Sequence, residues 1–363
     1  MKTALPRLTL LAASLAFSTS LLAAEDKVLN VYNWSDYIDE SVLTQFEEET
    51  GIKVVYDVFD ANETLESKLL AGASGYDVVV PSSNFLARQI KAGVFQQLDK
   101  SKLPNLSNVW EPIQARMDES GISDYSINYM WGTIGIGYNV DKIKERMPDA
   151  PVNSYDLVFN PEIAAKFADC GIHILDAPSD VAQLVLNYIG KNPNTTDPKE
   201  LEAIEEPLLA VRPHIRKFHS SEYINALANG DICIAVGYSG DILQARDRAD
   251  EAGNGVQVKF VIPKEGTQVW FDQMAIPKSA EHPDNAHQFM NFMLRPEVIA
   301  KVSNAVAYAN GNKFAKEHMD QEIVNDPGIY PSDETMNRLF NATVLPTKAT
   351  RALTRIWTRV KSN

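Results

Sequence analysis

Residues 76–84 read YDVVVPSSN, in which three consecutive valines are followed by a proline, two serines and an asparagine. The valines do not alternate with polar residues, which is typical of a strand buried on both faces of a parallel sheet. A predicted helix that contains Leu65, Leu69 and Leu70 precedes the stretch, and a second predicted helix follows it. Because parallel strands are joined by crossover helices, the stretch predicts an α/β fold with a mostly parallel sheet.

The same alternation of strands and helices extends along the chain. Residues 27–32 and 52–59 are predicted strands on either side of an amphipathic helix over 39–50. Further strands are predicted at 133–138, 170–175, 231–237, 260–263 and 274–277, and further helices at 286–294, 297–303 and 351–360. The roughly 340 residues with this pattern exceed what one hydrophobic core usually organises, so we expect two lobes.

Residues 1–24 have the pattern of a secretory signal peptide. Lys2 and Arg7 form a short basic region, residues 8–17 are apolar, and small residues precede Glu25. No cysteine lies at the predicted cleavage point, and no later stretch is apolar over the roughly 20 residues that a spanning helix needs. We therefore expect an exported, soluble chain without a lipid anchor.

The charge and the cysteines narrow the classes of function. The formal net charge is −14, and such an excess of carboxylates repels nucleic acid and attracts cationic small molecules. An acidic surface is also compatible with export alone. Cys170 and Cys233 are the two cysteines, and one disulfide is the default in an oxidising compartment.

Motifs for catalysis or for a cofactor are not found in the sequence. The glycines of residues 132–137 follow the order G-x-x-G-x-G, which is wrong for a dinucleotide loop, and no Walker lysine is present. The six histidines form neither an H-E-x-x-H motif nor a Cys/His cluster with zinc spacing, and G-x-S-x-G does not occur. We expect no enzyme activity, no catalytic residue, no metal and no cofactor.

Three stretches combine aromatic and acidic side chains at predicted strand ends. They are residues 34–37 (WSDY), 238–241 (YSGD) and 270–272 (WFD), and Tyr308 follows later. In an open α/β sheet the ligand crevice lies beyond the carboxyl ends of the strands. Aromatic walls with carboxylate ends are complementary to a linear di- or triamine. Each stretch also has a structural alternative, because Trp270 and Phe271 fit a core and Asp241 fits a helix N-cap.

The chain resembles the periplasmic polyamine-binding proteins of ABC importers, the putrescine- and spermidine-binding group, along essentially its whole mature length. The resemblance rests on stretches such as VYNWSDYI (31–38), YDVVVPSSNFLARQI (76–90), GIGYNVDKI (135–143), FHSSEYINALANGDICIAVGYSGD (218–241) and YANGNK (308–313). It implies a two-lobed type II binding-protein fold, each lobe a mostly parallel sheet flanked by helices, with the ligand in the cleft between the lobes. We expect residues 25–137 plus 258–305 in the first lobe and 138–257 plus 306–363 in the second.

The resemblance also implies the binding residues and the disulfide. Cys170 and Cys233 match the disulfide positions of putrescine-type members. Trp270 matches a position that is tryptophan in spermidine binders and phenylalanine in putrescine binders. The implied ligand-binding residues are Trp34, Ser35, Asp36, Tyr37, Ser82, Asp180, Tyr238, Asp241, Trp270, Asp272 and Tyr308.

Departures from the family pattern leave the identity of the amine open. Asp180 stands where the family usually has glutamate, and Tyr238 where tryptophan is frequent. Asn84 replaces an aromatic residue of some spermidine binders, Leu345 lies where a polar contact can occur, and Asn128 replaces a usual proline.

The implied function is capture of putrescine or spermidine in the periplasm, by a monomer, and delivery to an inner-membrane ABC permease complex. Three alternatives remain at this stage. The chain could be a polyamine sensor that docks on a receptor, a binder of a related amine such as cadaverine or agmatine, or, more remotely, an exported enzyme that acts on an amine.

Overall fold

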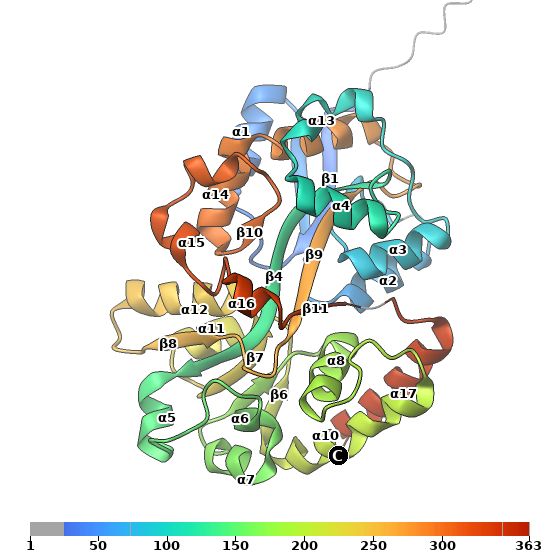
Figure 1. Cartoon of the computed structure of the whole chain (residues 1–363). Helices are drawn as coiled ribbons and strands as arrows, with labels where there is room; N and C mark the ends of the chain where they lie inside the picture. The colour runs from blue at the N-terminus through green and yellow to red at the C-terminus, as the bar shows by residue number, and fades with distance from the viewer. Residues whose placement is uncertain (1–24, 73, 343, 363) are drawn as a thin grey trace, which may run out of the picture.

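The chain forms two α/β lobes, which lie one above the other in Figure 1. The structure, a computed structural model, describes residues 25–72, 74–342 and 344–362, so the predicted signal peptide lies outside the described residues. Among the described residues, no helix combines the length and the apolar character that crossing a bilayer requires. The predicted two-lobed α/β fold is confirmed.

The first lobe is built on three parallel strands, β1 (Val28–Trp34), β2 (Lys53–Phe59) and β3 (Val78–Val79). The valines of the stretch at 76–84 lie in and beside β3 and are completely buried, as the missing alternation predicts. The helices around these strands are α1 (Glu40–Thr50), α2 (Asn62–Leu70), α3 (Ser83–Lys91), α4 (Glu111–Glu119), α13 (Pro283–Met293) and α14 (Pro296–Val306).

The second lobe repeats this plan with the parallel strands β5 (Ile172–Ile174), β6 (Ile215–Phe218) and β7 (Ile234–Tyr238). Its longer helices are α5 (Val140–Arg146), α8 (Pro178–Tyr188), α10 (Glu205–Val211), α11 (Tyr223–Ala228), α12 (Ser239–Ala252) and the C-terminal α17 (Thr347–Ser362). Short helices complete the chain: α6 (Asp156–Phe159), α7 (Pro161–Ala164), α9 (Pro198–Leu201), α15 (Gln321–Asn325) and α16 (Asp333–Met336).

Two strands, β4 (Ser126–Asn139) and β9 (Gln268–Ala275), run from one lobe toward the other (Figure 1). They pair antiparallel with each other and connect the parallel strands in the order β2-β1-β3-β9-β4-β7-β5-β6. The parallel arrangement therefore holds for the outer strands of each lobe, whereas the strands at the junction are antiparallel.

Both crossing strands begin earlier than predicted, β4 at residue 126 rather than 133 and β9 at 268 rather than 274. Every residue of β4 is buried, because elements of both lobes cover its two faces. Such a strand shows no alternation that would mark its start. Because β9 begins at residue 268, residues 270–272 lie inside this strand and not at its end.

Two short strands pair differently from the expected division of the chain. The strand β8 (Val258–Val261) pairs with residues 136–139 of β4, on the edge of β4 opposite to β7, although residues 258–305 were expected in the first lobe. The strand β10 (Ala309–Asn310) pairs with residues 130–131 of β4, in the half of β4 that pairs with β9. A third short strand, β11 (Phe340–Asn341), pairs with the start of β9. The lobe boundaries as a whole stay a prediction.

The predicted disulfide between Cys170 and Cys233 is confirmed. The two Cα atoms lie 5.6 Å apart, within the range that a disulfide spans. The bond joins the segment before β5 to the segment before β7, so it fastens two neighbouring strands of the second lobe.

Candidate functional site

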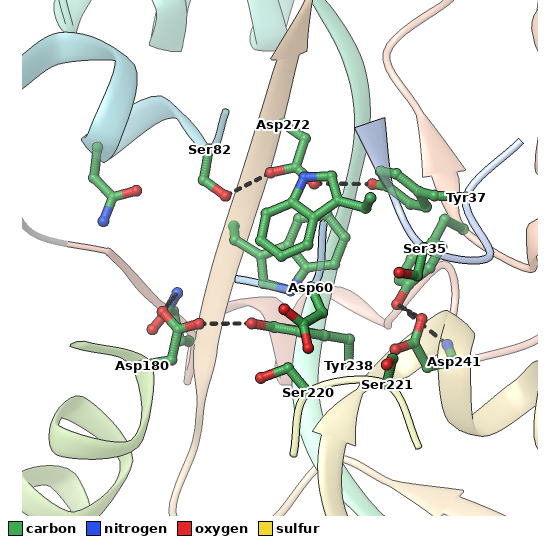
Figure 2. Close-up of a pocket in the computed structure, with 15 residues that line it drawn as sticks. Ser35, Tyr37, Asp60, Ser82, Asp180, Ser220, Ser221, Tyr238, Asp241 and Asp272 are labelled. Carbon is green, nitrogen blue, oxygen red and sulfur yellow. Dashed lines mark hydrogen bonds between the residues drawn. The ribbon is translucent and has the colours of Figure 1, made fainter. Parts of the chain in front are cut away.

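A pocket lies between the two lobes, beside the place where β4 and β9 pass from one lobe to the other. The space between its side chains, with the open mouth and its solvent included, amounts to about 500 Å³. Figure 2 shows that its side chains converge from several elements of both lobes. The lining residues are Trp34, Ser35, Tyr37, Asp60, Ser82, Asn84, Asp180, Ser220, Ser221, Tyr238, Asp241, Gln268, Trp270, Asp272 and Tyr308.

The end of β1 brings two aromatic side chains to the pocket. Trp34 is the last residue of β1, and its indole Nε1 donates to the carbonyl of Val80 at 2.8 Å. Asp36 has a positive φ of 52°, so the chain turns sharply between Trp34 and Tyr37. The hydroxyl of Tyr129 on β4 donates to the carbonyl of Tyr37 at 2.5 Å and holds that turn in place.

Five aromatic rings form the walls of the pocket. Tyr238 lies edge-on to both tryptophans, with ring centroids 6.0 Å from Trp34 and 5.9 Å from Trp270. Tyr308 closes the group, at 5.2 Å from Trp270 and 5.1 Å from Tyr37. Edge-to-face arrangements of this kind are a favourable geometry for aromatic pairs, and they leave ring faces available to a cation.

Two glycines make room for these rings. A Cβ atom at Gly132, on β4, would lie 2.7 Å from Cζ2 of Trp270 and 3.0 Å from Cδ1 of Tyr308. A Cβ atom at Gly240, at the start of α12, would overlap the ring of Tyr308. The glycine at residue 132 therefore serves ring packing.

Three aspartates lie among the rings, and each is held by two neutral donors. Asp272 accepts from the hydroxyls of Ser82 at 2.6 Å and Tyr37 at 3.1 Å (Figure 2). Asp241 accepts from the hydroxyls of Tyr223 at 2.6 Å and Tyr308 at 2.8 Å.

Asp180, at the start of α8, is the third aspartate. It accepts from the hydroxyl of Tyr238 at 2.9 Å and from Nε2 of Gln268 at 3.2 Å. In the described part of the chain, none of the three aspartates forms an ion pair. The lining contains no lysine, arginine or histidine.

Burial shifts the acidity of these groups. Loss of solvent raises the pKa of Asp241 to about 7 and the pKa of Asp272 to about 7, while the hydroxyl donors act in the opposite direction. Burial likewise raises the pKa of Asp180. Carboxylates kept from water without a positive partner are costly, so the pocket is suited to a ligand that brings positive charge.

The pocket unites all the site residues implied by the sequence except Asp36. That side chain points out of the pocket and forms an ion pair with Arg248 of α12 at 2.6 Å, with both side chains about one-third exposed. Asp36 is therefore not among the residues that line the pocket, and its expected contact with an amine stays a prediction. The left-handed backbone at Asp36 explains the result, because it turns Ser35 and Tyr37 inward and the side chain between them outward.

Five lining residues were not among those expected: Asp60, Asn84, Ser220, Ser221 and Gln268. Asp60 follows β2, and the two serines follow β6 shortly after its end. The place of Asp60 directly after the predicted strand at 52–59 was a signal that could have found it. Gln268 is the first residue of β9, and it reaches the pocket because β9 begins close to the place where the two lobes meet.

A metal site is not evident. Within residues 25–72, 74–342 and 344–362, no three side chains of histidine, cysteine, aspartate or glutamate gather in a way that could hold a metal ion. The aspartates of the pocket instead face hydroxyl and amide donors.

The fold and this interlobe pocket define a binding protein, and comparison with known proteins agrees. Residues 41–331 match the model of the bacterial extracellular solute-binding protein family, and the chain belongs to that family. It is 54% identical over 358 residues to the putrescine-binding periplasmic protein SpuD of Pseudomonas aeruginosa, covering 98% of each chain. It is 51% identical to the putrescine-binding periplasmic protein PotF of Escherichia coli, covering 96% of this chain and 95% of PotF.

A solved structure supports the same assignment. The spermidine/putrescine ABC transporter substrate-binding protein PotD of Streptococcus pneumoniae superposes with a TM-score of 0.73 at 31% identity, covering 92% of this chain and 98% of PotD. These relatives are named as binding proteins and not as enzymes.

Proposed function

We propose that this protein captures a linear polyamine, putrescine or spermidine, in the periplasm and delivers it to an ABC permease of the inner membrane. The observation that carries the proposal is the set of three buried aspartates, Asp180, Asp241 and Asp272, which lie among aromatic rings and have no cationic partner within the described residues. The names of the relatives, which are putrescine-binding or spermidine/putrescine-binding, support the same ligand class.

Charge and shape both favour a diamine or triamine. Each ammonium group can form short, charge-assisted hydrogen bonds with a buried carboxylate, and these bonds are the strongest of their kind in a water-poor site. The methylene chain between the ammonium groups lies well against flat aromatic surfaces. Cation–π attraction adds roughly 0.5 to 2 kcal/mol for each ammonium close to a ring face.

The proposal assigns a role to each group of lining residues. Asp241 and Asp272 each bind an ammonium group, and Asp180 provides a further carboxylate beside Tyr238. Trp34, Tyr37, Tyr238, Trp270 and Tyr308 enclose the chain of the ligand, and Ser35 and Ser82 add polar contacts. Because the walls come from both lobes, ligand binding and lobe closure are coupled.

The proposal is tested by calorimetry on protein freed of endogenous ligand by unfolding, washing and refolding. Putrescine, cadaverine, agmatine, spermidine and spermine are titrated in turn, with glutamine and glucose as controls. We expect saturable binding of at least one amine and none of the controls. The ligand assignment is wrong if no amine binds at millimolar concentration.

A matched pair of variants links the binding to the pocket. Asp272→Asn keeps the shape of the side chain and removes its charge. The binding free energy of the amine should therefore become less favourable by about 2 to 5 kcal/mol. Asp124→Asn changes an exposed aspartate that pairs with Lys100 at the surface, and it should leave the affinity unchanged.

Delivery to a permease is tested in cells. Uptake of a radiolabelled amine should be lost when this gene is deleted and restored by the wild-type gene, but not by the Asp272→Asn gene. Unchanged uptake together with a lost transcriptional response to the amine would favour the sensor alternative instead.

A further inference from the structure

We propose that Gln268 is a further ligand-binding residue, whose side-chain carbonyl accepts from a terminal nitrogen of the ligand at the end of the pocket formed with Asp180. The inference rests on the proposed amine-binding function and deepens it. At this end of the pocket, we expect the protein to bind terminal groups that carry at least two N–H bonds, such as a primary ammonium or a guanidinium.

The first observation is an unpartnered acceptor. Gln268 is the first residue of β9, is 2% exposed and lines the pocket. In the described part of the chain its Oε1 atom has no hydrogen-bond partner. Leaving a buried acceptor unpaired costs roughly 1 to 3 kcal/mol, so a donor is expected to reach it in the bound state.

The orientation of the amide follows from its other contact. Nε2 of Gln268 donates to Oδ1 of Asp180 at 3.2 Å, and the amide oxygen, which has no hydrogen to donate, could not form this bond to a carboxylate oxygen. The nitrogen therefore faces Asp180, and the oxygen is left for another partner. The hydroxyl of Tyr238 holds the second oxygen of Asp180, which prevents the carboxylate from turning away.

The polarity of the unpartnered atom selects the ligand group. Among the lining residues, two buried side-chain atoms lack a partner: Nε1 of Trp270, which is a donor, and Oε1 of Gln268, which is an acceptor. An ammonium or guanidinium group can only donate, so it can satisfy Gln268 and not Trp270.

Two acceptors at one end set a requirement on the ligand. Asp180 supplies negative charge, and Gln268 supplies a neutral carbonyl next to it. A nitrogen group with several N–H bonds can donate to both at once, whereas a fully alkylated nitrogen can donate to neither. This end of the pocket therefore selects a ligand by the number of N–H bonds on its terminal nitrogen as well as by its charge.

The test compares two substitutions by calorimetry with putrescine and with agmatine at pH 8. Gln268→Met keeps the length of the side chain but replaces the amide carbonyl by a thioether, which accepts only weakly, and the dissociation constant should rise by about ten- to a hundredfold. Gln268→Glu keeps acceptor oxygens toward the ligand and loses the N–H bond to Asp180. It should bind at least one of the two amines within about threefold of the parent, or more tightly.

This contrast separates ligand contact from mere positioning of Asp180. If Gln268 acted only through its N–H bond to Asp180, both substitutions would weaken binding alike, and that result would overturn the proposal. Parent-like affinity of Gln268→Met would also overturn it. If the parent itself binds no amine, the proposed function fails, and this inference fails with it.

Gln183 offers a matched control. It lies on α8, is 4% exposed, and its Oε1 atom also lacks a partner, but it does not line the pocket. Gln183→Met should therefore keep the parent affinity within about twofold. Each variant is first checked for a cooperative thermal transition, and Gln268→Leu replaces Gln268→Met if that transition is lost.

Discussion

At the scale of single residues, the pocket depends on carboxylates that the chain itself does not neutralise. Asp241 and Asp272 receive hydrogen bonds from hydroxyl groups, yet burial still raises the pKa of each to about 7. Their protonation therefore changes within the pH range in which the protein is handled, and both stability and binding should respond.

The stability of the closed, ligand-free protein should fall as the pH rises from about 4 to about 7. In this window the folded carboxyl groups of Asp241 and Asp272 hold protons that ordinary carboxyl groups, with a pKa of 3.8, have lost in the unfolded chain. The folded state binds more protons, so the free energy of unfolding decreases with rising pH.

Amine binding should show the opposite trend. An ammonium group pairs with the ionised carboxylate, so protons must leave first, and affinity should fall by up to about tenfold per pH unit and per carboxylate below pH 7. Calorimetry between pH 8 and pH 5, in two buffers of different ionisation enthalpy, measures both the affinity and the protons released. The pH dependence should be shallower in Asp272→Asn, and an affinity that does not change with pH would contradict the expectation.

At the scale of elements, β4 carries glycines that serve two different purposes. Gly132 lies behind two lining residues of the pocket, where its missing side chain leaves room for Trp270 and Tyr308. Gly137 lies five residues further along, where a Cβ atom would come within 2.6 Å of Ile242 and 3.0 Å of Leu227 in the core of the second lobe.

The two positions predict different consequences of the same substitution. Gly132→Ala should displace the rings of Trp270 and Tyr308 and weaken amine binding by about tenfold or more, because shifted rings lose their contact with the ligand. Gly137→Ala should instead lower the free energy of unfolding by about 1 to 3 kcal/mol through overpacking, with binding nearly unchanged. Calorimetry and urea denaturation of both variants measure the contrast, and equal loss of affinity in both would refute it.

At the scale of the whole molecule, the lobes are in contact across the mouth of the pocket. The ion pair between Asp36 and Arg248 connects the turn after β1 to α12, and Nε2 of Gln244 donates to the carbonyl of Asp36 at 3.2 Å. On another side, the hydroxyl of Ser179 on α8 donates to Glu63 of α2 at 2.7 Å. These contacts join the two lobes, so a movement that opens the cleft would break them.

Loss of the ion pair should therefore weaken amine binding slightly and leave the fold intact. Both side chains are about one-third exposed, and pairs of this kind contribute roughly 0.2 to 1 kcal/mol. Arg248→Met and Asp36→Asn should each raise the dissociation constant up to about fivefold, and the double variant should add little to either. Arg146→Met breaks a pair with Asp169 inside one lobe and serves as the control. Additive losses in the double variant would show that the two side chains act separately.

Local patterns in the sequence were sufficient for several features of this protein. The uninterrupted valines at 78–80 and the alternation of helices with strands indicated the α/β fold, because periodicity reports how each segment is buried. The aromatic and acidic residues at 34–37, 238–241 and 270–272 could be selected as candidates, because aromatic walls with carboxylate ends are complementary to a linear amine. Seven residues of these stretches line the pocket: Trp34, Ser35, Tyr37, Tyr238, Asp241, Trp270 and Asp272. Asp36, Ser239, Gly240 and Phe271 do not.

Other features depend on how the lobes pack, and no local pattern reports that. Asp36 turns outward to Arg248, more than 200 residues away in the chain, because a left-handed backbone reverses its direction. The full lengths of β4 and β9 were missed because a strand covered on both faces shows no alternation. Gln268 reaches the pocket only because β9 begins where the lobes meet. Its side-chain oxygen can be identified as an unpartnered acceptor only from the structure, in which the side-chain nitrogen donates to Asp180. The sequence alone determined the fold class and the chemistry of the site, whereas contacts between distant segments decided which side chains face the ligand.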